Sequence, residues 1–381
     1  MSEKIRRAAG TATLLLLLVA TLQISPSCAR KGHRGNPLDS QADSIFRADS
    51  ALTLLASANL WILGECGGLV VEGRYAYVAG YSEAVCIIDI ANPLSPRMAG
   101  IKLPEVGASP AYWISRPVAK WGSWLFVEDN LGIGIFDVSA PSSIKQVGEI
   151  HTARNQVPRG MGVSAWLGRT LCYSGQNVYD VRSPANPLCV DTLQFSDGSC
   201  PPGEFKTYVL GKGFCGKYLI AVAFCDSDPR NPELWVLLAS EARLIKSIPL
   251  PYDGGGNLAV CSTTVLVGGG WSYCRADESE SNNWTEVDVS NVSAPRIVRT
   301  VDLNTVFAEG RYKGFRPQIA CLTGDRIVFG GRRGLIVCDR DFNCLRSDIS
   351  EDSNLEVRDC VVSAGLLYVT TDLGLRIYRM P

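Results

Sequence analysis

Residues 85–96 read Val-Cys-Ile-Ile-Asp-Ile-Ala-Asn-Pro-Leu-Ser-Pro, an apolar run that ends in an aspartate and a turn rich in Asn and Pro. A Gly-containing turn and another apolar run precede it at 72–79. Related copies follow at 122–141, 168–187, 216–238, 286–295, 324–339 and 365–378, and the copy at 216–238 lacks the aspartate. Most copies lie about 40–50 residues apart, which is typical of one four-stranded propeller blade per repeat.

The apolar runs are hydrophobic on both faces of the expected strands, as at 85–88. Blades that stack face to face bury both sides of each sheet, so this pattern also favours a propeller. The last copy lacks an outer strand, and the run at 60–64 precedes the first copy. We therefore predict an all-β propeller of seven four-stranded blades, in which this N-terminal strand completes the last blade. Six or eight blades are the alternatives, because the fourth copy is weak.

The segments 85–96, 133–141 and 287–295 resemble the LVIVD repeat, a β-propeller repeat of exported or surface proteins of bacteria and archaea. The resemblance extends over roughly residues 57–381 and is poorest in the fourth copy. It implies a fold and a location in the cell envelope, and it implies no activity. The repeated aspartates Asp89, Asp137, Asp180, Asp288 and Asp339 are expected to be structural, each accepting backbone hydrogen bonds in the turn that follows it.

The N-terminus has the pattern of an export signal. Lys4, Arg6 and Arg7 form a basic region, and an apolar region follows at 13–22. Cys28 then permits two interpretations, a lipoprotein signal in which Cys28 is lipidated or ordinary cleavage at the small residues before it. Ser25 stands where a lipoprotein signal usually has Leu. We expect a signal peptide at 1–28, a polar tether at 29–56 and the propeller at 57–381, with a possible short helix from Ser44 to Leu55 in the tether.

Composition excludes several classes of function. The net charge is −1, whereas nucleic-acid binding needs a surplus of Lys and Arg, so we expect no nucleic-acid partner. The chain has only two histidines, and it lacks a nucleophile elbow, zincin spacing and a phosphate-binding Gly-rich loop. We therefore expect no catalytic residues, no cofactor and no metal.

The chain has 14 cysteines. Cys215, Cys261, Cys321 and Cys360 fall near the expected innermost strands, where a small apolar side chain suits the crowded centre. We expect most cysteines to be buried thiols. One or two disulfides are the alternative, and Cys338–Cys344 across a hairpin is a candidate.

Several loops that lead into inner strands carry a basic residue at a similar position. If they gather at the mouth of the channel, they can bind a carboxylate, a sulfate or an acidic sugar. The alternative is that each arginine pairs with acids of its own blade. The candidate ligand-binding residues are Arg116, Arg159, Arg316, Arg358, Tyr112, Trp113, His151, Arg311 and Tyr312.

These observations predict a non-catalytic binding or scaffold protein of the bacterial cell envelope. Its partner is expected to be an envelope protein or a glycan held on the loop face, with membrane contact only through a lipid anchor on Cys28. The alternative is a propeller enzyme, a lyase or hydrolase acting on sugars or lactones at the channel mouth. Such sites collect acids, His or a metal, whereas the loops here are basic and aromatic.

Overall fold

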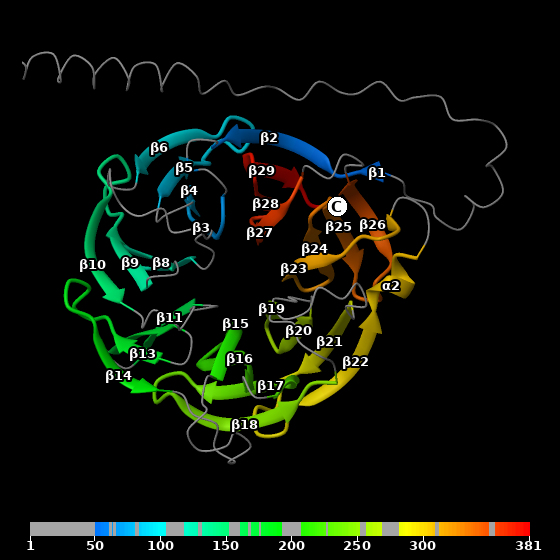
Figure 1. Ribbon diagram of the computed structural model, residues 1–381. Helices are drawn as coiled ribbons and strands as arrows, with labels where there is room; N and C mark the ends of the chain where they lie inside the picture. Colours follow the sequence, from blue (N-terminus) through cyan, green and yellow to red (C-terminus); the bar gives the residue numbers. More distant parts are fainter. Residues whose placement is uncertain are drawn as a thin grey trace, which may run out of the picture.

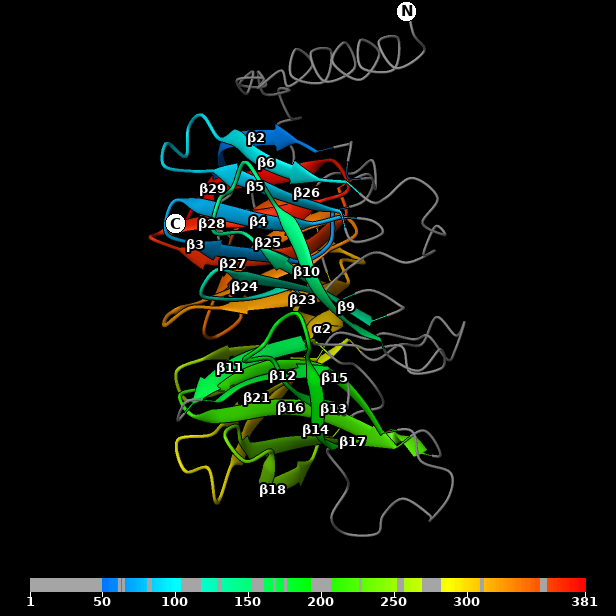
Figure 2. The same ribbon diagram turned by 90° about the vertical axis from the view of Figure 1, so that its left-hand side faces the viewer.

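The computed structural model describes residues 50–60, 63, 66–80, 84–103, 118–128, 132–151, 161–166, 169–174, 177–192, 207–225, 228–251, 257–268, 282–308, 312–349 and 355–381. In these residues the chain forms seven antiparallel sheets arranged radially in a ring (Figure 1). Figure 2 shows the ring from the side. The predicted seven-bladed, all-β propeller is confirmed.

Each blade is a meander from the centre outwards. Blade one contains β3 (Leu69–Glu72), β4 (Tyr75–Ala79), β5 (Val85–Asp89) and β6 (Arg97–Lys102). Blade two contains β7 (Val118–Trp121), β8 (Trp124–Glu128), β9 (Gly132–Asp137) and β10 (Lys145–His151). Blade three contains β11 (Met161–Trp166), β12 (Arg169–Ser174), β13 (Asn177–Asp180) and β14 (Leu188–Thr192). Blade four contains β15 (Thr207–Cys215), β16 (Tyr218–Cys225), β17 (Asp228–Leu238) and β18 (Arg243–Pro249).

Blade five contains β19 (Asn257–Cys261), β20 (Thr264–Gly268), β21 (Asn283–Asp288) and β22 (Arg296–Asp302). The one-turn helix α2 (Leu303–Val306) follows it. Blade six contains β23 (Pro317–Leu322), β24 (Arg326–Gly331), β25 (Gly334–Asp339) and β26 (Cys344–Ile349), and β1 (Ser50–Ala51) adds a short parallel strand to β26. Blade seven contains β27 (Val357–Ser363), β28 (Leu366–Thr371) and β29 (Gly374–Arg379), with β2 (Thr53–Asn59) as its outer strand.

Burial between the blades explains why the strands are apolar on both faces. Clusters of buried side chains lie at all seven junctions between neighbouring blades. For example, Val85 and Ile87 of blade one pack with Leu125 and Val127 of blade two. Because each blade is buried on both sides, its stability depends on its neighbours, as in other repeat architectures.

The N-terminal segment closes the ring, but the closing strand is not the one that the sequence suggests. The prediction placed it at 60–64, whereas β2 at Thr53–Asn59 pairs antiparallel with β29. Gly374 pairs with Asn59 in this register, and a Cβ atom at Gly374 would lie 2.1 Å from the Ala58 carbonyl oxygen. A side chain at this position is therefore incompatible with the closure.

The boundary between tether and propeller moves accordingly. Residues 50–51 and 53–56 belong to β1 and β2, so the structure has strands where the sequence suggested the end of a tether at 29–56 and of a short helix from Ser44 to Leu55. The predicted signal peptide at 1–28 lies outside the described residues. Within the described part of the chain, the structure contains no helix of the length and apolarity needed to cross a bilayer.

A buried carboxylate strengthens the closure near the centre of the ring. Asp359 of β27 accepts hydrogen bonds from the backbone N–H of Leu69 in β3, at 2.8 Å, and of Cys360, at 2.7 Å. Although the residue is half-buried overall, its carboxyl group points into the junction of blades seven and one. Burial raises the pKa of Asp359 to about 7, against the effect of the two backbone hydrogen bonds.

Candidate functional site

Each repeated aspartate ends the third strand of its blade and holds the turn that leads to the fourth strand. In each case a carboxylate oxygen accepts a hydrogen bond from the backbone N–H two residues later, at 2.9–3.0 Å, in the way the sequence predicts. Hydrogen bonds from the hydroxyl and backbone of Ser139 lower the pKa of Asp137. These carboxylates lie in separate blades, and each accepts hydrogen bonds from its own turn. The described residues contain no group of three or more His, Cys, Asp or Glu side chains that suits a metal ion.

Two segments of blade six bring basic side chains together at one end of its strands. The loop that leads into β23 carries Lys313 and Arg316, and the turn between β24 and β25 carries Arg332 and Arg333. The Nη1 atom of Arg333 donates a hydrogen bond to the Lys313 carbonyl oxygen at 2.8 Å, which ties the two segments together. We call these four residues the blade-six basic patch.

Aromatic packing fixes the loop that carries half of this patch. Phe315 is fully buried, and its ring packs edge-on against Phe307 with the centroids 5.6 Å apart. The ring of Tyr312 lies 6.2 Å from that of Phe307, between centroids. Behind the loop, a Cβ atom at Gly331 would lie 2.4 Å from the Arg316 carbonyl oxygen, so the turn and the loop are in close contact. The basic side chains therefore extend from a well-packed base.

The charge of the patch is exposed. Lys313, Arg316 and Arg332 are exposed, and Arg333 is half-buried. In the part of the chain that the structure describes, no acidic side chain lies within ion-pair distance of Lys313, Arg332 or Arg333. Clustered like charges repel one another, so an anion that binds here relieves the repulsion. The forked donors of Arg suit carboxylate, sulfate and phosphate oxygens.

The structure assigns a different role to Arg358, which the sequence placed in the ligand site. Its side chain is only 10% exposed and forms ion pairs with Glu356, at 2.8 Å, and with Asp372, at 3.0 Å. The structure thus places Arg358 in ion pairs with acids of its own blade, which is the alternative that the sequence analysis left open.

The other described candidates are not gathered at one point. Tyr312 is half-buried and packs against the apolar cluster that contains Phe307 and Phe315. His151 ends β10, the outer strand of blade two, and its Nδ1 atom lies 3.2 Å from the Glu149 carboxylate. In Figure 1, β10 lies across the ring from β23 and β24. Of the described candidates, only Arg316 and Tyr312 belong to one local surface.

Five further candidates, Arg116, Arg159, Tyr112, Trp113 and Arg311, lie outside the described residues, as does Cys28. Arg332 and Arg333, in contrast, were missed by the sequence reasoning. That reasoning considered only loops that lead into inner strands, whereas these two residues form the turn between the second and third strands. Two adjacent arginines between glycines, at 331–334, were the available indication.

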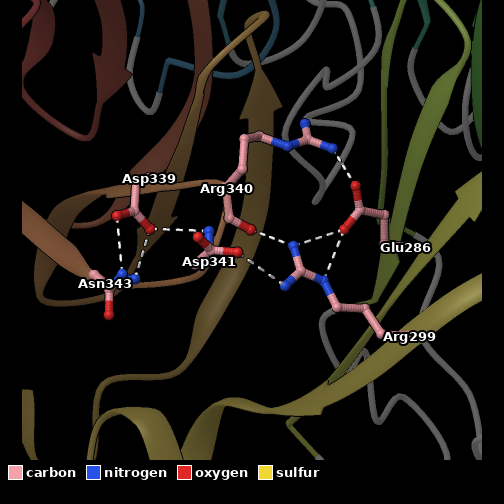
Figure 3. A network of polar contacts seen from close by, with 6 residues as sticks. All are labelled: Glu286, Arg299, Asp339, Arg340, Asp341 and Asn343. Atoms are coloured by element: carbon pink, nitrogen blue, oxygen red, sulfur yellow. Dashed lines mark hydrogen bonds and ion pairs between the residues drawn. The ribbon is translucent and has the colours of Figure 1, made fainter.

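At the opposite end of β25, charged side chains join blades five and six (Figure 3). The Glu286 carboxylate forms an ion pair with Arg299 at 2.8 Å and another with Arg340 of the neighbouring blade. Arg299 also donates a hydrogen bond to the Arg340 carbonyl oxygen, and its guanidinium lies 4.8 Å from the centroid of the Phe342 ring. The acidic and basic side chains of this network pair with one another, so we interpret the network as a structural contact between the two blades.

Comparisons with known proteins agree with this architecture. The family model of the LVIVD repeat matches residues 63–102 and 115–152, which contain blades one and two, and the chain thus carries LVIVD repeats, consistent with an LVIVD-repeat propeller family. No curated protein sequence is similar enough to the chain to match it.

Among solved structures, the WD40 domain of Neurospora crassa Pan2 has a TM-score of 0.57 and 11% sequence identity, over 84% of this chain and 90% of that one. BamB from Moraxella catarrhalis has a TM-score of 0.49 and 13% identity, over 83% of this chain and 82% of that one. At such identities, the likeness to the Pan2 domain concerns the propeller fold alone.

Proposed function

We propose that this LVIVD-repeat propeller is a non-catalytic binding protein of the bacterial cell envelope, and that it recognises an anionic partner through the blade-six basic patch. The partner is an acidic glycan or an acidic segment of an envelope protein. The export signal predicted at 1–28 supports the location. The one observation that carries the proposal is the patch itself, in which the Arg333 hydrogen bond to Lys313 and the close approach of Gly331 to the Arg316 carbonyl hold two basic segments together.

The physical argument is that the patch is preorganised. Ordering a flexible loop on binding costs free energy, whereas the loop at 312–316 is already fixed by the buried Phe315 and by the Arg333 hydrogen bond. A hydrogen bond between two ionised groups is about twice as strong as a neutral one. A polyanion that contacts several of these donors at once therefore gains affinity without rearranging the fold.

The experiment titrates the full chain with dextran sulfate and, separately, with polyglutamate by calorimetry at low ionic strength. Arg332→Ala/Arg333→Ala is the test variant, because it removes both guanidinium groups of the turn between β24 and β25. Loss of two charged contacts is expected to weaken binding by about tenfold or more. Binding is also expected to weaken as salt increases, since salt screens exposed charges.

A charge-matched control is Arg97→Ala/Arg243→Ala, which removes two exposed arginines from β6 and β18. The control should change the affinity by no more than about twofold, since a change in net charge alone acts weakly at exposed sites. Equal loss in both variants, or no binding of either polyanion by the wild-type chain, contradicts the proposal. Preference for dextran sulfate indicates an acidic glycan, and preference for polyglutamate indicates an acidic protein.

The location is tested by fractionating cells that express the full chain and its Cys28→Ala variant. Export predicts that both chains are absent from the cytoplasm. If Cys28 carries a lipid, the wild-type protein incorporates a labelled fatty acid and the Cys28→Ala variant does not. Retention of an unprocessed chain in the cytoplasm contradicts the proposed location.

A further inference from the structure

Two cysteines face each other across the third and fourth strands of blade six. Cys338 of β25 and Cys344 of β26 are directly paired in the antiparallel register. Their Sγ atoms lie 3.9 Å apart. Directly opposed residues of antiparallel strands have Cα atoms about 4.5–5.5 Å apart. That separation lies within the range of about 4.4–6.8 Å that a disulfide spans, so the two thiols can be joined without separating the strands.

The same position in the other blades shows that this pair is unusual within the ring. In every blade a bulge interrupts the pairing of the third and fourth strands, which identifies equivalent residues without reference to sequence similarity. The pairs next to the bulge are Ile88–Met98, Phe136–Gln146, Tyr179–Cys189, Leu237–Leu244, Val287–Ile297, Cys338–Cys344 and Tyr378–Leu54. Only blade six places two cysteines opposite each other there.

The environment of the two thiols sets the order in which they react. Cys338 is fully buried, and its hydrogen bond to Cys344 together with burial raises its pKa well above the usual thiol value. Cys344 is half-buried and so is accessible to an external reagent. An oxidant therefore meets Cys344 first, and Cys338 lies close enough to follow.

We propose that Cys338 and Cys344 form a disulfide when the chain enters an oxidising compartment, by exchange with an external disulfide of a thiol oxidase or of oxidised glutathione. The Cys344 thiolate attacks that disulfide and releases one thiolate of the oxidant. Cys338 then gives its proton to the released thiolate, and its sulfur attacks Cys344 Sγ and displaces the second thiolate. Two protein thiols are oxidised by two electrons, and one disulfide is reduced to two thiols.

This disulfide closes the turn that joins blades five and six. The residues between the two cysteines include Arg340 and Asp341, and both contact blade five through Glu286 and Arg299 (Figure 3). Phe342, in the same turn, has a left-handed backbone with φ of 65°. A covalent closure of this turn limits its freedom in the unfolded chain, so the oxidised protein should retain the junction more firmly than the reduced one.

Peptide mapping tests the bond directly. The full chain is incubated with oxidised glutathione, remaining thiols are alkylated, and the protein is digested with trypsin without reduction. Trypsin cuts after Arg333, Arg340 and Arg346. Because one cut falls between the two cysteines, a disulfide holds the peptides 334–340 and 341–346 together as one species that separates on reduction. We expect this linked species to dominate over the two alkylated peptides.

Two cysteine variants test whether the linked species contains the bond between Cys338 and Cys344. The linked species must disappear in Cys344→Ser and persist in Cys321→Ser/Cys360→Ser, whose cysteines lie in the contacting inner strands β23 and β27. Separate alkylated peptides from the wild-type chain, or mixing of Cys338 and Cys344 with many other cysteines, overturns the proposal. The mapping does not depend on anion binding, so failure here and failure of the proposed function are distinguished.

Discussion

Glu286 offers a sensitive test of how the blades are joined. Its carboxylate is 10% exposed, and the two arginines that it pairs with, Arg299 and Arg340, are 33% and 26% exposed. The change Glu286→Gln keeps the shape and removes the charge. Breaking a buried ion pair costs about 3–5 kcal/mol, and the lower end applies here because both arginines reach water. We therefore expect a loss of about 3 kcal/mol.

Calorimetry converts this loss into a melting temperature. Unfolding entropy is about 2.1 cal/mol/K per residue, so a ring of about 330 residues that unfolds as one unit should melt about 4 °C lower. The matched control is Glu241→Gln, because Glu241 pairs with Arg243 at 2.9 Å with side chains 56% and 59% exposed. Such an exposed pair contributes about 0–1 kcal/mol, so the control should shift the melting temperature by about 1 °C or less. Equal shifts in the two variants refute the reasoning.

Two further changes test the closure of the ring. The pKa of Asp359 is about 7 in the folded protein and about 4 when unfolded, so rising pH between these values favours the unfolded state. The melting temperature of Asp359→Asn should therefore fall less than that of the wild type as the pH rises from 5 to 8. Parallel plots of melting temperature against pH for the two proteins contradict this. Gly374→Ala should destabilise the protein by about 2–3 kcal/mol in urea unfolding, because the new Cβ atom would clash with the Ala58 carbonyl oxygen. The control Gly324→Ala should have little effect, because the space around Gly324 is open. Similar losses of stability in the two variants argue against the closure described.

The fold was predictable because its repeat is regular. The apolar runs, the aspartates and the turns after them recur with a spacing that few architectures share. The closing strand was harder, since Thr53–Asn59 reads Thr-Leu-Leu-Ala-Ser-Ala-Asn, which is poor in the β-branched and aromatic residues that favour strands. Its conformation comes from pairing with β29, at the far end of the chain, and local sequence does not carry that information.

The candidate site was only partly predictable for a related reason. Arg316 was identified from its position before an inner strand, but its neighbours Arg332 and Arg333 come from a different turn. Arg358 shared the same sequence position, and yet it is neutralised by Glu356 and Asp372. Which arginines stay exposed depends on which acids the fold brings near them, and that depends on strand register across a blade.

Hydrogen exchange of the full chain, with and without dextran sulfate, tests recognition by the blade-six basic patch most directly. Binding there predicts slower exchange at 312–316 and 331–334, where the backbone carries Lys313, Arg316, Arg332 and Arg333. The outer strand β18 should exchange at the same rate in both samples. Unchanged exchange in the two blade-six segments, with slower exchange at another part of the ring, contradicts the account.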